Sequence, residues 1–233
     1  ELIALQEKYT AQLQEIDSYD NQIEALQQQV DATFKELMQQ ASVLSEQRKI
    51  ASLGLARQLV EMIAPLGMPN TRFSVDFKTK SAPDADGIDE ICFLFSANKS
   101  GDLQPVANTA SGGEISRLML CLKAMIAGAT ALPAIIFDEV DTGVSGDIAN
   151  KMGDIMHELG TKMQVMAITH LPQIASKGNA HYYVFKKEEN DRTITQIKQM
   201  DTEERVIEIA RMLSGAALTE ASMANTRDLL GVD

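Results

Sequence analysis

A heptad repeat in the N-terminal part of the chain limits the folds that are open to the whole protein. Residues 1–64 contain no proline, and their one glycine is Gly54. When Leu2 is taken as an a position, the following a positions of the repeat are all apolar: Leu2, Tyr9, Ile16, Ile23, Val30, Leu37 and Leu44. An apolar repeat of about 3.5 residues predicts a helix of a coiled coil. At about 1.5 Å per residue this helix would be roughly 95 Å long, which favours an arm over a surface helix packed on its own domain.

The two ends of the predicted arm indicate what else it needs. Its d positions are less regular, since Gln12, Thr33, Gln40 and Gln47 interrupt them, and an imperfect antiparallel pairing is expected. No N-cap residue precedes Leu2 and no second heptad run follows, so we expect the partner helix in a segment upstream of Glu1. The helix should end near Pro65, which predicts an arm of residues 1–64 and a second domain of residues 65–233.

Residues 65–233 alternate between strand-like and helix-like patterns, which predicts an α/β fold. Helical spacing covers residues 111–129, 145–159, 202–213 and 217–230. Strand-like runs cover residues 72–79, 90–96, 134–138, 164–169, 180–186 and 193–199, the last two as a hairpin. The uninterrupted apolar runs at 134–137 and 164–169 predict two neighbouring parallel strands, the first of them buried on both faces.

Composition excludes several classes of protein. Lys and Arg number 21 against 33 Asp and Glu, a net charge of −12, so the chain as a whole should repel nucleic acid. The basic residues Lys186, Lys187, Arg192 and Lys198 on the predicted hairpin are interrupted by acids, which favours an ordinary solvated face over a DNA site. Cys92 and Cys121 lie in apolar runs and are interpreted as buried, reduced thiols of a cytoplasmic protein. No apolar run approaches the about 18 residues of a membrane span, and no signal peptide begins the chain, so no membrane partner is expected.

Two adjacent carboxylates, Asp138 and Glu139, end the apolar strand that begins at Ala134. The carboxyl end of such a strand faces the ligand crevice of an open α/β sheet. There Asp138 would hold a Mg²⁺ through a bound water, and Glu139 would polarise a water for attack on a phosphate. The alternative is a strand that ends by chance in two surface acids.

Ser111, Gly112, Gly113 and Glu114 open the helix that precedes this strand. Two glycines let the backbone approach a ligand closely, and the free amides of a helix N-terminus favour a phosphate. A plain N-cap serine with a flexible entry is the alternative. His170 follows the strand at 164–169 and becomes a candidate γ-phosphate contact through its closeness to Asp138, whereas His157 and His181 are interpreted as ordinary surface or core residues.

The order of these motifs resembles the C-terminal half of an ABC-type ATPase head. Residues 110–114 resemble its signature motif, residues 135–139 its Walker B strand, Asp141 its D-loop and His170 its switch histidine. Joined to a coiled coil, the pattern is similar to the SMC-like branch. The wording of Phe137–Gly146 and Thr169–Ala175 resembles the RecN family of bacterial DNA repair proteins most closely.

That resemblance implies a P-loop NTPase-like head with a mixed or parallel sheet, flanking helices, and ATP and Mg²⁺ as cofactors. It implies that Ser111, Gly112, Gly113 and Glu114 contact the ATP of a second protomer in a homodimer. Asp138, Glu139 and His170 would act on the ATP of their own head, as catalytic residues in the case of Glu139 and His170. The implied role is recombinational repair of DNA double-strand breaks at the nucleoid, with DNA bound through the assembled protein.

The chain lacks one part of this machinery. No G-x-x-x-x-G-K-[ST] loop occurs in it, and the family carries that Walker A loop in an N-terminal segment that precedes the coiled coil. We therefore expect this chain alone to be inactive and to need the N-terminal half. The alternatives are an SMC head that organises chromosomes, a transporter ATPase subunit, which the heptads disfavour, and a non-catalytic coiled-coil adaptor.

Overall fold

The structure is a computed structural model that describes residues 1–108, 112–130, 132–138, 140–189, 192–215 and 218–232, without the side chains of residues 4, 11, 12 and 14–17. Contacts divide the chain into two compact units. The first unit comprises Glu1–Gly54 and Val75–Cys92, and the second comprises Leu55–Ser74 and Phe93–Asp233. Each unit is described by itself, and the domain boundary at residue 64 stays a prediction.

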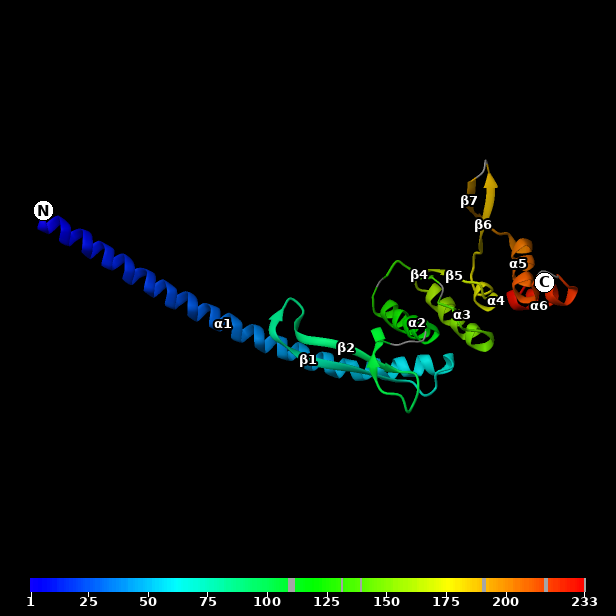
Figure 1. Cartoon of the computed structure of the whole chain (residues 1–233), viewed down its shortest axis with the longest axis horizontal. Helices are drawn as coiled ribbons and strands as arrows, with labels where there is room; N and C mark the ends of the chain where they lie inside the picture. Colours follow the sequence, from blue (N-terminus) through cyan, green and yellow to red (C-terminus); the bar gives the residue numbers. More distant parts are fainter. Residues whose placement is uncertain (109–111, 131, 139, 190–191, 216–217, 233) are drawn as a thin grey trace. The chain divides into compact units, whose positions relative to one another are not determined.

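Helix α1 (Leu2–Ile63) is a single unbroken helix, as the heptads and the lack of proline predict (Figure 1). It ends at a 3-10 turn, η1 (Ala64–Leu66), where Pro65 removes a backbone donor. Several apolar a positions are exposed along the arm, with Ile23 at 63% and Val30 at 61%. Apolar side chains at heptad spacing are thus left facing solvent over most of the helix.

In the first unit, α1 is fastened to the hairpin of β1 (Arg72–Asp84) and β2 (Gly87–Ser96). The Ser45 hydroxyl donates to Asp89 Oδ1 at 2.6 Å, and the Arg48 guanidinium lies 3.2 Å from Asp89 Oδ2. Arg48 also donates to the carbonyl of Asp86 at 2.8 Å. The strands are longer than predicted, because β1 continues from residue 79 to Asp84 and β2 begins at Gly87. The turn itself is reduced to two residues before Gly87, whose φ of 95° suits glycine.

The Ser45–Asp89 contact is expected to stabilise the first unit by about 1–3 kcal/mol, since Asp89 is a buried carboxylate with charge-assisted partners. The hydrogen bond from Ser45, and then Arg48, lower the pKa of Asp89. A lowered carboxyl pKa gives stability that is present above its ordinary value of 3.8 and is lost as the pH falls through the folded value. Urea unfolding of Ser45→Ala at pH 7 measures the loss.

The control is Glu46→Ala, which removes an exposed ion pair with Lys49 on the same helical turn. Such pairs contribute about 0–1 kcal/mol, so this variant should match the wild type. Equal unfolding curves for Ser45→Ala and Glu46→Ala would show that the buried contact contributes nothing.

The second unit is built on a parallel pair of strands, β4 (Ala134–Asp138) and β5 (Gln164–Ile168). Their register runs from Ala134 opposite Gln164 to Asp138 opposite Ile168, which confirms the predicted parallel pairing. Helices α2 (Gly112–Ala129) and α3 (Gly146–Gly160) supply the core around this pair, with Leu118, Phe137 and Met152 fully buried. The Lys123 ammonium lies 5.5 Å from the centre of the Phe137 ring, so α2 reaches over β4.

Burial of the first strand on both faces, expected from its sequence, is wrong within the described residues. Phe137 is fully buried, whereas its neighbour Ile136 is 56% exposed. Met166 and Ile168 of β5 are also exposed. Since alternate residues of a strand point to opposite faces, one face of this parallel pair is packed and the other is bare and apolar.

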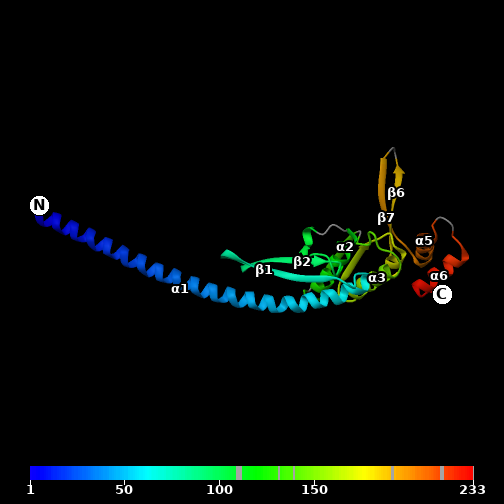
Figure 2. The ribbon, with the colours of Figure 1, turned by 60° about the horizontal axis from the view of Figure 1, so that its bottom comes forward.

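The remaining elements follow the predicted order. Strands β6 (Tyr182–Glu189) and β7 (Arg192–Gln199) form the expected antiparallel hairpin, which Figure 2 shows as a two-stranded ribbon. Capping boxes begin both final helices, α5 (Thr202–Ser214) and α6 (Glu220–Leu230). A two-residue strand, β3 (Gln104–Pro105), pairs with β2, and the short segments η2 (Val106–Asn108) and α4 (Pro172–Ala175) complete the fold.

The prediction that both thiols are buried is correct for only one of the two cysteines. Cys121 on α2 has no exposed surface, and burial raises its pKa to about 12. Cys92 on β2 is half-buried. Cys121 is not placed as a reactive thiolate, because reactive cysteines have a lowered pKa and an accessible sulfur.

The base of the arm is held in the second unit. Leu59, Ile63 and Leu66 are fully buried there. Gly67 ends η1 with φ of +81°, and a Cβ added at this glycine would lie 2.6 Å from Ile148 Cδ1 of α3. The chain therefore needs glycine at this turn for its backbone angle, and the Ile148 side chain packs close to it.

Candidate functional site

The carboxyl ends of β4 and β5 bring two predicted site residues to one edge of the parallel pair. Asp138 is the last residue of β4 and is exposed beside Ile168, the last residue of β5. His170 follows two residues later, and its side chain is 71% exposed. Ligands of open α/β sheets bind at this edge, so the side chains of Asp138 and His170 are both accessible to a bound ligand.

Asp141 lies between them and is not a surface acid. Its side chain is 1% exposed, and its Oδ2 accepts a hydrogen bond from the hydroxyl of Thr169. The backbone N–H of His170 donates to the same oxygen at 3.2 Å, and His170 Nδ1 lies 3.4 Å from it. The loop after β4 is therefore tied directly to the residues that follow β5.

The loop around Asp141 is a tight turn. The N–H of Val144 donates to the carbonyl of Asp141 at 3.2 Å, and Gly143 and Gly146 have φ of 72° and 59°. These left-handed conformations let the chain reverse before α3 begins at Gly146. The glycines explain why this segment can carry a buried acid and start a helix within a few residues.

The N-terminus of α2 packs on this same loop. A Cβ added at Gly113 would lie 3.2 Å from the carbonyl oxygen of Thr142, so the glycine allows a close backbone approach. Gly112 has open space around it, and Glu114 stands in the first turn of the helix. The structure therefore brings part of the predicted signature motif to the predicted D-loop.

Two predicted residues, Ser111 and Glu139, lie outside the described residues, so their roles stay predictions. Among the residues that are described, no group of three or more His, Cys, Asp or Glu side chains could hold a metal ion. Asp138 alone would thus give a single carboxylate, which suits a Mg²⁺ that keeps most of its waters.

Sequence reasoning missed Thr169. Its hydroxyl donates to Asp141 and accepts the N–H of Leu171 at 3.0 Å, so it links the loop after β4 to the segment after β5. A hydroxyl residue directly before the histidine, at the end of a strand, was the available signal. His157 and His181 are engaged elsewhere: His157 Nδ1 lies 3.0 Å from the carbonyl of Lys177, and burial, then Arg205, lower the pKa of His181.

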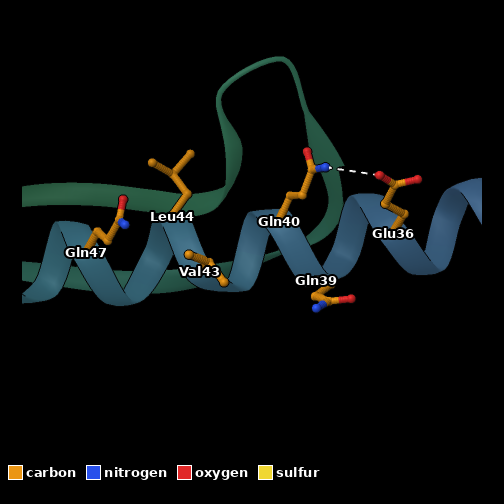
Figure 3. Close-up of a pocket in the computed structure, with 6 residues that line it drawn as sticks. All are labelled: Glu36, Gln39, Gln40, Val43, Leu44 and Gln47. Atoms are coloured by element: carbon orange, nitrogen blue, oxygen red, sulfur yellow. Dashed lines mark hydrogen bonds between the residues drawn. The ribbon is translucent and has the colours of Figure 1, made fainter.

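A hollow of about 360 Å³ lies on α1 in the first unit. Its lining differs from the polar residues at the carboxyl ends of β4 and β5. Its lining comes from one helix face: Glu36, Gln39, Gln40, Val43, Leu44 and Gln47 (Figure 3). Gln40 donates to Glu36 at 3.3 Å, and the set holds no nucleophile and a single carboxylate. The residues include the a position Leu44 and the d positions Gln40 and Gln47, which is typical of a helix-pairing seam.

Comparisons with known proteins identify relatives along nearly the whole chain. The DNA repair protein RecN of Vibrio cholerae is 35% identical over 220 residues, which are 94% of this chain and 40% of that protein. RecN of Bacillus subtilis is 32% identical over 238 residues, 96% of this chain, and RecN of Deinococcus radiodurans is 37% identical over 206 residues, 88% of this chain. The chain spans about 40% of the length of these relatives. No protein-family model matches it.

Solved structures show the fold. The Smc head domain of Pyrococcus furiosus, with an extended coiled coil, matches with a TM-score of 0.55 at 16% identity and covers 86% of this chain. The match spans 47% of that Pyrococcus furiosus chain. The Smc head with coiled coil of Pyrococcus yayanosii matches with a TM-score of 0.53 at 15% identity, over 70% of this chain and 29% of that one. The predicted fold class, half of an ABC-type ATPase head with a long helical arm, is confirmed. Within the described residues, none of the helices combines the length and apolar character needed to cross a bilayer.

Proposed function

Because the chain belongs to the RecN family of bacterial DNA repair proteins, we propose that it forms the C-terminal half of an ATPase head. The full-length protein then hydrolyses ATP in the recombinational repair of DNA double-strand breaks. The observation that supports this most is the edge where Asp138 ends β4 and His170 follows the end of β5, with Asp141 buried between their loops. A head of this kind needs an exposed acid and an exposed histidine at one strand edge, and the chain supplies both.

Each residue at the edge has a role in this proposal. Asp138 holds Mg²⁺ through a bound water, since its carboxylate is exposed and single. Glu139, next in the chain, orients the attacking water and accepts its proton, and His170 contacts the γ-phosphate as it leaves. Bound Mg²⁺ supplies positive charge next to the phosphate oxygens of ATP.

The N-terminus of α2 serves a second nucleotide. Gly112, Gly113 and Glu114 open α2, Ser111 precedes them in the sequence, and the backbone N–H groups of a helix N-terminus suit a phosphate. We assign these residues to the ATP of the opposing protomer in a homodimer. The packing of Gly113 against Thr142 supports a link between that contact and the Asp141 loop.

The bare face of the parallel strands supports a missing half of the head. Ile136, Met166 and Ile168 expose apolar area that a complete α/β sheet covers. We assign this face to the N-terminal segment that carries the Walker A loop and the partner helix of α1. Without that segment the chain has no cradle for the β-phosphate and is expected to be inactive.

DNA reaches the protein through the assembled dimer in this proposal, because the chain carries a net charge of −12. The proposed DNA repair takes place in the cytoplasm, at the nucleoid. The DNA-binding surface belongs to the completed head and its partner.

The test compares this chain alone with the chain joined to its N-terminal segment. The joined protein is expected to hydrolyse ATP faster when DNA is added and to dimerise with ATP, while the chain alone does neither. Hydrolysis is measured by phosphate release and dimerisation by light scattering, with Asp138→Asn in the joined protein as the inactive control. Absence of ATP-dependent dimerisation in the joined protein would favour the non-catalytic adaptor instead.

A further inference from the structure

We propose that Thr169 is a positioning residue that couples the Asp141 loop to His170, an inference that rests on the proposed function for its catalytic consequence. Its hydroxyl is the side-chain donor to Asp141 Oδ2, and that carboxylate is almost completely buried. The same hydroxyl accepts the N–H of Leu171 at 3.0 Å. One oxygen atom thus fixes the carboxylate on one side and the entry to α4 on the other.

The burial of Asp141 makes this donor important. A carboxylate with 1% exposure cannot draw on water, so it depends on the donors that the protein provides. Within the described part of the chain, the contacts of this carboxylate fall on Oδ2, from the Thr169 hydroxyl, the His170 N–H and the His170 ring. Oδ1 is buried and has no hydrogen-bond partner among the described residues. Loss of the Thr169 hydroxyl therefore leaves the carboxylate held by His170 alone.

A shift of the Asp141 carboxylate would affect both the turn that follows it and the ring of His170. The Asp141 carbonyl accepts the Val144 N–H, so the turn follows any shift of Asp141. The His170 ring is exposed but rests 3.4 Å from the same carboxylate, so its direction depends on where that carboxylate sits. Thr169 thereby keeps the Asp141 loop, which packs against the N-terminus of α2, in register with the histidine assigned to the nucleotide.

Amide hydrogen exchange on this chain tests the coupling without any catalysis. In Thr169→Val the N–H groups of His170, Leu171 and Val144 are expected to exchange about tenfold faster or more, because the isostere keeps the shape and removes the hydroxyl. The N–H of Met200, which donates to the His181 carbonyl at 2.9 Å, serves as the internal control and should not change. Thr169→Ser keeps the hydroxyl and should restore slow exchange.

An unchanged rate at Val144 with faster exchange at Leu171 would overturn the proposal, since the hydroxyl would then only order the start of α4. If Thr169→Val fails to fold, Thr169→Ala replaces it, because the side chain is half-buried and its truncation leaves little void. The same two exchange patterns decide the outcome for that variant.

The catalytic consequence of the Thr169 hydroxyl is measured as ATP turnover of the full-length protein. Thr169→Val should lower kcat by about tenfold to 100-fold with little change in KM for ATP, and Thr169→Ser should recover most of it. A changed KM with unchanged kcat would overturn the positioning role. Wild-type protein without ATP turnover would count against the proposed function instead, and the exchange experiment on the chain would still decide the coupling.

Discussion

Replacing Glu139 by glutamine is expected to lower ATP turnover of the full-length protein by about 100-fold or more. Glutamine keeps the size of the side chain and its ability to hold a water molecule, but it cannot accept the proton of that water. Steady-state phosphate release measures turnover. ATP binding and ATP-dependent dimerisation should persist, and the dimer should last longer because hydrolysis is what separates the heads in our proposal.

The matched control is Glu189→Gln, which makes the same change of charge at an exposed residue at the end of β6, opposite Arg192. It should leave turnover within about twofold, the ordinary scatter of a neutral surface change. Full activity in Glu139→Gln would remove the residue from the catalytic assignment. Asp138 would then be the sole acidic candidate at the end of β4.

Replacing Phe137 by alanine is expected to destabilise the chain by about 3–5 kcal/mol, the largest stability effect that the fold predicts. The ring is fully buried between the strands and the helices, with Lys123 of α2 over its face. Its removal leaves a cavity that the neighbouring helices cannot close. Urea unfolding followed by circular dichroism gives the free energy of unfolding.

Ile136→Ala is the control for this experiment, because it lies one residue away on the same strand and faces the opposite side. Ile136 is 56% exposed, so its truncation should cost less than about 1 kcal/mol. The pair of variants thus compares the two faces of β4 directly. Similar losses for both would mean that the apolar face of the strand pair is covered in this chain after all.

The sequence predicted those parts of the fold in which the hydrophobic pattern alone determines the secondary structure. A long heptad run without proline can only continue as a helix, and α1 is unbroken from Leu2 to Ile63. The parallel pair followed from two apolar runs separated by a helical one. The run Ile135-Ile136-Phe137 carries no alternation, so it could not tell that Ile136 is bare while Phe137 is buried. That difference depends on what lies across the sheet, which local sequence does not encode.

The candidate site was predicted residue by residue but not as a network. Asp138 stands out because it ends an apolar strand, and His170 stands out because it follows one. The burial of Asp141 and its bond to Thr169 depend on how two loops meet, and these loops are separated by α3 and β5. A threonine before a histidine is too common in sequences to indicate such a hydrogen bond by itself. Similarly, β1 continues beyond its predicted end at residue 79 and passes through Pro83, which an edge strand tolerates.

The contact between Gly67 and Ile148 has a consequence for the order in which the protein is made. Leu59, Ile63 and Leu66 leave the ribosome well before α3, against which the turn at Gly67 is fitted. Until α3 has been synthesised, this buried surface has no counterpart, and the arm emerges as a helix with an uncovered base. Co-translational folding of the head should therefore wait for α3, and a ribosome stalled before Ile148 should carry an arm that proteases cut at its base.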